Sequence, residues 1–250
     1  MHMTDPQFAV VTGVSRRIGF ALAEHCAAAG FDLLVAASDD CVDGAATRLR
    51  GRGGMVEAVR ADLGDPDGVD ELCDILQVLG RPVDALLIAP DRAPSVEPRP
   101  SFFDRAPTEV VGALDHSILG PTHLAHRLGG DMRRRGHGRI LFACSPPMGG
   151  DGDFATAFGA NAFLTAFALA LRQTLEGSGV TVTCLAPQPP CAGVAEGRDA
   201  RAAARLGFDA MMRGDPGVSA GVAAGVGAAG GAVVGHSLAS RTASASAKLS

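Results

Sequence analysis

The chain has 250 residues, of which 47% are hydrophobic, so it is long and apolar enough to bury one large core in a single domain. Its net charge of -5 argues against a general nucleic-acid role, which needs a clustered excess of Lys and Arg. No apolar stretch of membrane-spanning length stands out and residues 1–6 lack the features of a signal peptide, so we expect a cytoplasmic protein that binds neither nucleic acid nor membrane.

Two features of the composition limit the chemistry. The six cysteines form no CxxC or Cys/His pattern, so we expect reduced thiols, no disulfide and no metal site. The sequence holds no Tyr and no Trp, and it has one Lys (Lys248) and one Asn (Asn161). A mechanism that needs a phenol or a core lysine from this chain is therefore excluded.

The first predicted elements are a strand, a turn and a helix. Residues 8–11 are continuously apolar, as in a buried parallel strand, and apolar residues recur at helical spacing over 18–26. Gly13 and Gly19 lie at the two ends of the turn. Glycine lets the backbone approach a phosphate and lets the helix pack on the strand, while the helix N-terminus points its N–H groups at the anion. The stretch predicts a dinucleotide-binding turn.

Residues 12–19, TGVSRRIG, resemble the TGxxxGIG turn of the short-chain dehydrogenase/reductase (SDR) family. Arg17 stands where the family has its middle glycine, so an alternative is that the fold persists while the pyrophosphate pocket is partly occluded. The resemblance extends over about residues 8–234. It implies a Rossmann-type, doubly wound α/β fold, with a mostly parallel sheet of about seven strands and helices on both faces, in one domain over residues 1–239.

A regular alternation of strands and helices follows the turn. The predicted strands cover residues 31–37, 55–60, 83–89, 138–145 and 180–186, and the predicted helices cover residues 41–52, 67–79, 108–136 and 154–175. By the resemblance, residues 188–214 form a lid over the substrate pocket, before a last helix (215–229) and a short strand (232–234). Residues 240–250 are small and polar and predict a disordered tail.

The resemblance also assigns cofactor-binding residues. The residue that ends the second strand selects the cofactor in this family; Ala37 or Ser38 offers no carboxylate to the ribose, and Arg16 matches a base that meets the extra phosphate of NADP. NADP(H) is the expected cofactor, although a shift of register toward Asp39 would favour NAD. Asp62 resembles the acid that binds the adenine amino group; the alternative is that Asp62 or Asp65 only caps the next helix. The full expected set is Gly13, Ser15, Arg16, Ile18, Gly19, Ser38, Asp62, Leu63 and Ala89.

Most of the catalytic residues that the family uses are missing. Ser145, after the fifth strand, occupies the place of the substrate-orienting serine, and Ser117 matches the catalytic asparagine. The fourth strand leads into residues 88–91, IAPD, where the family has Asn-Asn-Ala-Gly beside the nicotinamide ribose. Only Ser145 of the expected catalytic set is therefore present.

The positions of the expected catalytic Tyr and Lys depend on the register. Counting forward from Ser145 puts them at Phe158 and Ala162, whereas counting back from the sixth strand puts them at Ala157 and Asn161. Both registers lack the phenol that protonates a carbonyl and the ammonium that lowers its pKa.

The two long helices, 108–136 and 154–175, carry more apolar residues than one face of a sheet covers. The resemblance implies that they form the contact of a homo-oligomer, a dimer or tetramer. His123 and His126 share a helical face without a third metal ligand, and residues 133–135, RRR, are expected to end the helix in solvent.

Three functions remain open. The chain is an SDR oxidoreductase that acts on a small-molecule carbonyl or alcohol with a rerouted proton source such as His116, or a catalytically silent nucleotide-binding subunit in a heteromer with an active relative. The third alternative is a non-redox enzyme that reuses the cleft. Nucleotide binding separates the third function from the others, and turnover separates the first from the second.

Overall fold

Seven parallel strands form one sheet, in the order β3-β2-β1-β4-β5-β6-β7. The computed structural model describes residues 6–52, 54–89, 91, 102–144, 154–187 and 196–220. All of these belong to one unit, residues 1–220. The strands are β1 (Phe8–Thr12), β2 (Asp32–Ala37), β3 (Val56–Arg60), β4 (Ala85–Ile88), β5 (Gly138–Ala143), β6 (Val180–Pro187) and β7 (Gly217–Ala220). The doubly wound α/β fold is confirmed.

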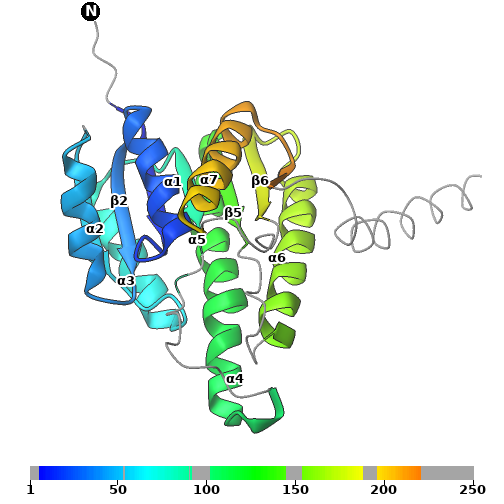
Figure 1. Ribbon diagram of the computed structural model, residues 1–250. Coiled ribbons are helices and arrows are strands. Elements are labelled where there is room, and N and C mark those ends of the chain that lie inside the picture. The colour runs from blue at the N-terminus through cyan, green and yellow to red at the C-terminus, as the bar shows by residue number, and fades with distance from the viewer. Residues whose placement is uncertain are drawn as a thin grey trace, which may run out of the picture. The chain divides into compact units, whose positions relative to one another are not determined.

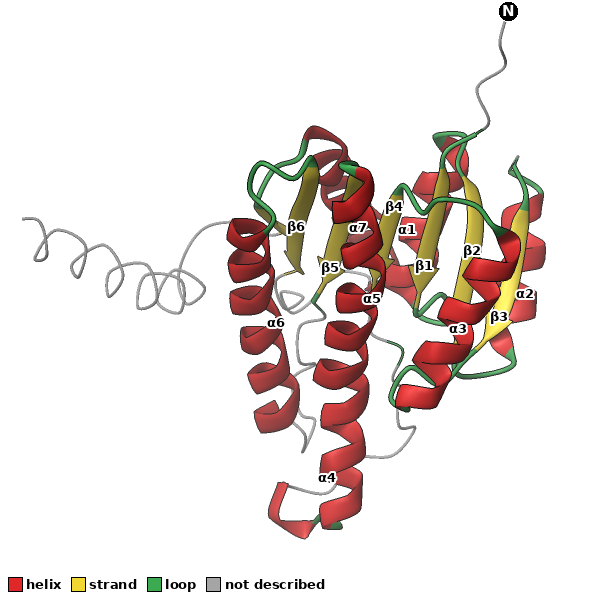
Figure 2. Cartoon of the chain, turned by 180° about the vertical axis from the view of Figure 1, so that it is seen from behind, coloured by secondary structure: helices red, strands yellow, loops and turns green. Residues whose placement is uncertain are grey.

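Helices cover both faces of the sheet. One layer contains α1 (Arg17–Ala28), α2 (Cys41–Arg50) and α7 (Glu196–Arg213) (Figure 1). The other contains α3 (Pro66–Leu79), α5 (Gly120–Arg135) and α6 (Phe154–Thr174), which stand in front when the molecule is seen from behind (Figure 2). The central strands are buried on both faces, which explains their continuous apolar sequences, whereas the edge strand β3 alternates between buried and exposed residues.

Local signals set several helix ends where the sequence predicts them. The side chain of Asp65 caps α3 by accepting the N–H of Asp67 at 3.0 Å, and Gly80 ends the helix in the left-handed conformation. Asp65, and not Asp62, is therefore the cap. The basic residues 133–135 lie in the last turn of α5 before Gly136, as predicted.

The helix predicted over 108–136 is interrupted. It consists of α4 (Pro107–Leu114), a π-helical turn η2 (Asp115–Leu119) and α5. Pro121 has no N–H to donate to the carbonyl four residues earlier, at Ser117, so the regular hydrogen-bond ladder breaks at this turn. The main chain also packs closely here, since a Cβ at Gly120 would lie 1.9 Å from the carbonyl oxygen of Leu63.

The C-terminal predictions need correction. Residues 196–213, assigned to a lid over 188–214, form α7, whose small side chains Ala203 and Ala204 are buried against the sheet. The Ala- and Arg-rich composition of this segment suggested a mobile flap. The small side chains on one face of α7 instead allow the helix to pack closely in the core. Residues 217–220 form β7 beside β6 and are not helical. The rest of that predicted lid, the strand at 232–234 and the tail at 240–250 lie outside the described residues.

The amino end of the sheet is held by a buried ion pair. Asp32 accepts hydrogen bonds from Nη1 of Arg81 and from the N–H of Met55, both at 2.7 Å. Arg81 also donates to the carbonyl of Pro6 and lies over the ring of Phe8. Burial opposes ionisation of Asp32, but these donors outweigh it and lower its pKa.

The prediction that no stretch of the chain has the length and apolar composition of a membrane-spanning segment was wrong for one helix, α6. Residues 155–174 of α6 have the length and apolar composition that would suffice to cross a membrane, and 22% of this window is buried. One side of α6 packs on β6, so the helix belongs to the layered α/β unit and presents an apolar outer side. The cytoplasmic location stays a prediction.

Candidate functional site

The turn between β1 and α1 has the close packing that its glycines predict. Gly13 has a φ of 67°, and a Cβ at Gly19 would lie 2.2 Å from the carbonyl oxygen of Gly13. The hydroxyl of Thr12 accepts the N–H of Ala89 at 3.2 Å and lies 3.3 Å from its carbonyl oxygen. The turn and the exit of β4 are thereby joined at the carboxyl edge of the sheet, where open α/β folds bind ligands.

The N-terminus of α1 is suited to an anion. Its N-cap residue, Arg16, is extended, makes no side-chain capping bond, and no acidic residue follows in the first turn. The first N–H groups of the helix therefore keep their capacity to bind the pyrophosphate of a dinucleotide. Arg17 places a side chain at the first helical position, where the family has glycine, and Ile18 is buried in the core. The turn fits a dinucleotide, with less room at its centre than a glycine gives.

Three charged or polar side chains meet beyond the end of β2. Asp39 accepts a hydrogen bond from the hydroxyl of Ser15 at 2.5 Å and an ion-paired one from Nη2 of Arg16 at 3.1 Å. The bond from Ser15, together with the N–H of Cys41 and the charge of Arg16, lowers the pKa of Asp39. Arg16 thus lies where the sequence predicts a phosphate-binding base, and it is paired with an ionised carboxylate.

Asp91, at the exit of β4, is a site residue that the sequence analysis did not single out. Its Oδ2 accepts the N–H of Ser38 at 2.5 Å, so its side chain reaches past the end of β1 to the end of β2. Asp91 is 7% exposed, and burial raises the pKa of its carboxyl. Its Oδ1 and Nε of Arg16 are both buried without a hydrogen-bond partner within the described residues. The unusual sequence IAPD at 88–91 was the only signal.

Asp62 is paired with a histidine of the π-helical turn. Its Oδ1 accepts the N–H of Gly64 at 2.9 Å and lies 2.8 Å from Nε2 of His116. Nδ1 of the same ring lies 2.7 Å from the carbonyl oxygen of Gly112, so both ring nitrogens face oxygen atoms. The adenine-binding role of Asp62 and the neighbouring Leu63 stays a prediction, and His116 competes for that carboxylate.

The predicted catalytic positions are only partly brought together. Ser117 lies half-buried in the π-helical turn, and Ser145 lies outside the described residues. The residue before it, Cys144, contacts the hydroxyl of Thr165 at 3.9 Å, which places this part of α6 beside the end of β5.

Burial along α6 distinguishes the two registers. Residues seven apart lie on the same face of a helix, so Ala157 and Asn161 share a face with the buried Leu164 and Ala168. Ala162 shares a face with Leu169, which is exposed, and Phe158 is itself 54% exposed. The geometry therefore favours Ala157 and Asn161 over Phe158 and Ala162 as the positions that face the sheet.

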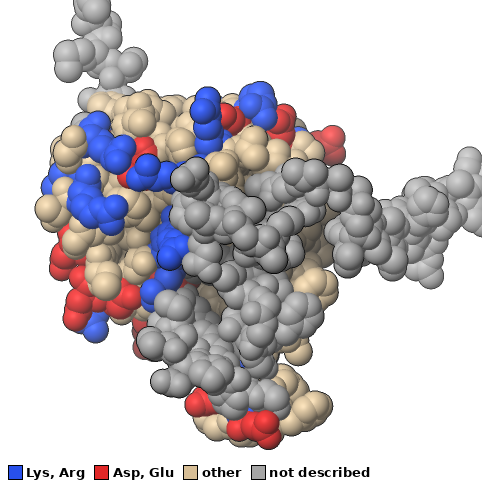
Figure 3. Space-filling view, in the orientation of Figure 1, with Lys and Arg blue, Asp and Glu red and all other residues tan. Residues whose placement is uncertain are grey.

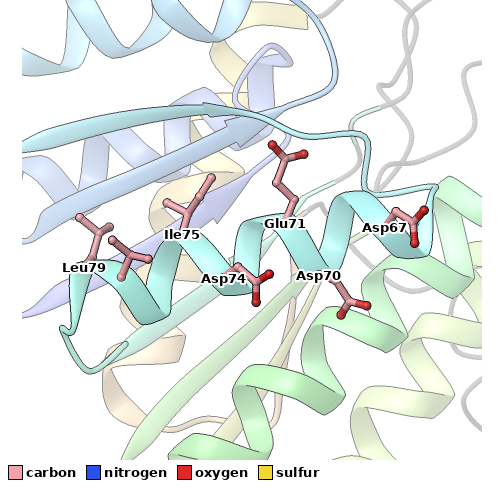
Figure 4. Close-up of a pocket in the computed structure, with 7 residues that line it drawn as sticks. Asp67, Asp70, Glu71, Asp74, Ile75 and Leu79 are labelled. Atoms are coloured by element: carbon pink, nitrogen blue, oxygen red, sulfur yellow. The ribbon is translucent and has the colours of Figure 1, made fainter.

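The described residues offer no metal-binding group of three or more His, Cys, Asp or Glu side chains. The described cysteines are all free thiols. A hollow of about 480 Å³ runs along α3, and its lining residues include Asp67, Asp70, Glu71 and Asp74 (Figure 4). All of its lining residues come from this one helix, so the hollow contains none of the predicted cofactor or catalytic residues.

The family model described as short chain dehydrogenase matches residues 7–199. The chain belongs to the short-chain dehydrogenase/reductase family. A 1-deoxy-11-beta-hydroxypentalenate dehydrogenase from Streptomyces avermitilis is 33% identical over 192 residues, which cover 75% of this chain and 69% of that protein. The chain also matches 2% of the length of polyketide synthase GfsA from Streptomyces halstedii, at 29% identity over 71% of its own length.

Solved structures show the same fold. A bulky-bulky ketone specific alcohol dehydrogenase from Comamonas testosteroni has a TM-score of 0.78 at 20% identity, with 95% of each chain covered. A gluconate 5-dehydrogenase from Beutenbergia cavernae, described as NAD(P) dependent and solved with bound NADP, has a TM-score of 0.63 at 30% identity, covering 72% of this SDR chain and 71% of the other. The family predicted from the turn is thereby confirmed.

Proposed function

We propose that this SDR chain binds NADP(H) at the carboxyl edge of β1 and β2 but does not itself catalyse carbonyl or alcohol oxidoreduction, and that it is the silent subunit of a complex with an active short-chain reductase. One observation supports the proposal: Ala157 and Asn161, one of the two predicted positions of the catalytic pair, lie on the sheet side of α6, and neither carries a phenol or an ammonium. A general acid typically contributes about 10²- to 10⁴-fold to the rate, and this sequence contains no Tyr.

Dinucleotide binding is supported by the uncapped N-terminus of α1 and by the close approach of Gly13 and Gly19. The phosphorylated cofactor is supported by the small residues Ala37 and Ser38 and by Arg16. A structure with bound NADP is 30% identical to this chain over the aligned part, which covers 72% of this chain and 71% of the other.

A partner subunit is supported by apolar side chains on the outer sides of the long helices. Several large ones are exposed, some of them more than half: Val111, Leu119, Phe158, Phe163 and Leu169. Exposed apolar surface of this extent usually marks an interface. A second copy of this chain and an active SDR subunit are both compatible with this surface, and the proposal commits to the active subunit because this chain lacks its own acid.

The test combines binding and turnover on the purified chain. NADPH is titrated with cofactor fluorescence as the readout, and the same samples are assayed with butane-2,3-dione as a small reactive carbonyl. We expect NADPH binding with turnover at background. Turnover by this chain alone at ordinary enzyme rates, about 1 to 10³ s⁻¹, would refute the silent subunit and leave the oxidoreductase reading in its place.

A non-redox enzyme in the same cleft is the second candidate. Arg17 replaces the middle glycine of the turn, and Asp91 already binds the N–H of Ser38; both departures from the family pattern favour this alternative. Absence of binding by both NADPH and NADH, in a chain with a cooperative thermal transition, would select it over the first proposal.

The surface charge gives nucleic acid no support as the partner. On the face that carries α1 and α2, a group of basic side chains lies above a group of acidic ones, and acidic side chains also occur among the basic ones (Figure 3). The ion pairs of Arg16 with Asp39 and of Arg60 with Asp40 are examples of this mixing.

A further inference from the structure

The carboxylate of Asp91 is an anion built into the ribose end of the cofactor site. It leaves the chain at the exit of β4 and bonds the N–H of Ser38 at the end of β2 at 2.5 Å, with only the end of β1 between these strands. The residue is 7% exposed, so this anion is enclosed by protein. A buried carboxylate is costly, and it persists only where its surroundings supply hydrogen bonds or opposite charge.

The charges that face Asp91 are those of Arg16 and Asp39. Arg16, in the turn before α1, is the opposite charge close enough to act on the carboxyl of Asp91, and Asp39, after β2, is the like charge. Arg16 itself is held by Asp39 at 3.1 Å. The ribose end therefore contains one positive charge and two carboxylates among the described residues.

A 2′-phosphate on an adenosine ribose would need the N–H that Asp91 binds and the arginine whose charge acts on Asp91. Backbone N–H groups and an arginine are the donors that bind phosphate oxygens in proteins. Ser38 offers such an N–H and Arg16 such a guanidinium, and Arg16 still has a buried Nε without a partner in the described part of the chain. A carboxylate and a phosphate compete for these donors.

We propose that Asp91 is a specificity-determining residue, an internal anion that takes the place of the 2′-phosphate and that NADP(H) must displace in order to bind. The inference rests on the proposed function, because it requires that the chain binds a dinucleotide. It adds that the wild-type chain has lost most of the preference for NADP(H) over NAD(H) that Arg16, Ala37 and Ser38 would otherwise give.

The test removes the anion and measures binding, not activity. Asp91→Ala removes the carboxylate, and Asp91→Asn keeps its size and one acceptor oxygen while removing the charge. Asp40→Asn is the matched control, because Asp40 lies two residues after Ser38, carries the same charge, is paired with Arg60 and points into solvent. Calorimetry with adenosine 2′,5′-bisphosphate and with ADP isolates the 2′-phosphate, and NADPH and NADH are titrated alongside.

We expect both Asp91 variants to bind adenosine 2′,5′-bisphosphate and NADPH about tenfold to a hundredfold more tightly than the wild type, as removal of one close charge at an effective dielectric of about 20 gives. ADP and NADH should change less than threefold, roughly 0.6 kcal/mol, and Asp40→Asn should leave all four affinities unchanged. Adding Arg16→Ala to Asp91→Ala should abolish the gain.

Other outcomes overturn the inference in distinguishable ways. Unchanged affinities in folded Asp91 variants would show that the carboxylate does not compete with the phosphate. Equal gains for ADP and adenosine 2′,5′-bisphosphate would show that Asp91 only takes up space. Absence of all dinucleotide binding in wild type and variants, each with a cooperative thermal transition, would refute the proposed function and the inference together.

Discussion

Replacing Ala157 by Tyr and Asn161 by Lys should give this chain a reductase activity that it lacks. Both positions are half-buried on the sheet side of α6, two turns before Leu164 and Ala168, which are buried. The two new side chains lie four residues apart, so their Cβ atoms are about 5–6 Å from each other on one helical face. The lysine ammonium would lower the pKa of the phenol from its usual value of about 10, and the phenol would protonate a bound carbonyl.

The expected gain follows from the chemistry that is restored. A positioned general acid contributes about 10²- to 10⁴-fold, so the double variant should reduce butane-2,3-dione with NADPH at about that factor above the wild type. Ser117→Asn is added as a third change, because Ser117, which lies in the π-helical turn, is predicted to match the family's asparagine. Oxidation of NADPH is followed by absorbance under saturating cofactor.

The matched control is Phe158→Tyr with Ala162→Lys, which makes the same chemical change on the exposed side of α6. A gain in this control without a gain in Ala157→Tyr/Asn161→Lys would refute our assignment of the sheet side. Failure of both variants to gain activity, despite NADPH binding, would contradict the idea that the missing acid alone explains the lack of turnover. It would indicate that the changed residues 88–91, at the predicted position of the nicotinamide ribose, also prevent catalysis.

Three further changes test separate parts of the structure. Arg16→Ala should weaken NADPH more than NADH in fluorescence titrations, because only NADPH carries the phosphate that we propose Arg16 binds; equal weakening would contradict this role. Asp32→Ala should lower the free energy of unfolding in urea by about 1–3 kcal/mol, because it leaves the partly exposed Arg81 and the N–H of Met55 without their acceptor; a loss below about 0.5 kcal/mol would show that the pair is dispensable. Asp91→Asn should be more stable than the wild type at neutral pH. Burial raises the pKa of Asp91 above its ordinary value of 3.8 in the folded state. Below pH 3.8 the carboxyl is protonated in both states and its burial costs no ionisation energy. As the pH rises through the raised pKa, the folded protein must bury a charged carboxylate and loses stability. The stability difference between Asp91→Asn and wild type should therefore vanish in acid, and a constant difference across pH would exclude titration of Asp91 as its cause.

The sequence predicted the first six strands, and the signal is strongest where a strand is a buried apolar run. β1 and β4 are examples, in which every residue is buried and the one polar residue, Thr12, ends β1. The C-terminal part lacks this contrast. α7 contains five Ala, four Arg and two Gly, and its buried residues include the small Ala203 and Ala204. This Ala- and Arg-rich composition led to its interpretation as a mobile flap, although the helix packs in the core.

The site was predictable where it depends on one local turn and not where it depends on contacts across strands. Gly13 and Gly19 are required by the turn itself, and the sequence shows them. The bond from Ser38 to Asp91 joins residues 53 positions apart, on opposite sides of β1, and it depends on the register of three strands. The pairing of Asp62 with His116 likewise joins the end of β3 to the π-helical turn. The only sequence signal for that turn is Pro121, which follows it.

The packing of Gly19 on Gly13 affects what a sequence search for this turn can detect. A methyl group at position 19 would lie 2.2 Å from the carbonyl oxygen of Gly13, so this glycine is required by the contact of helix with strand whether or not a nucleotide is bound. The position of Arg17 carries no such constraint from the fold. A scan that scores the outer glycines of this turn therefore detects the architecture, and only the middle residue reports on the ligand. Enzymes inferred from the outer pair alone will include chains that have kept the scaffold and changed its use.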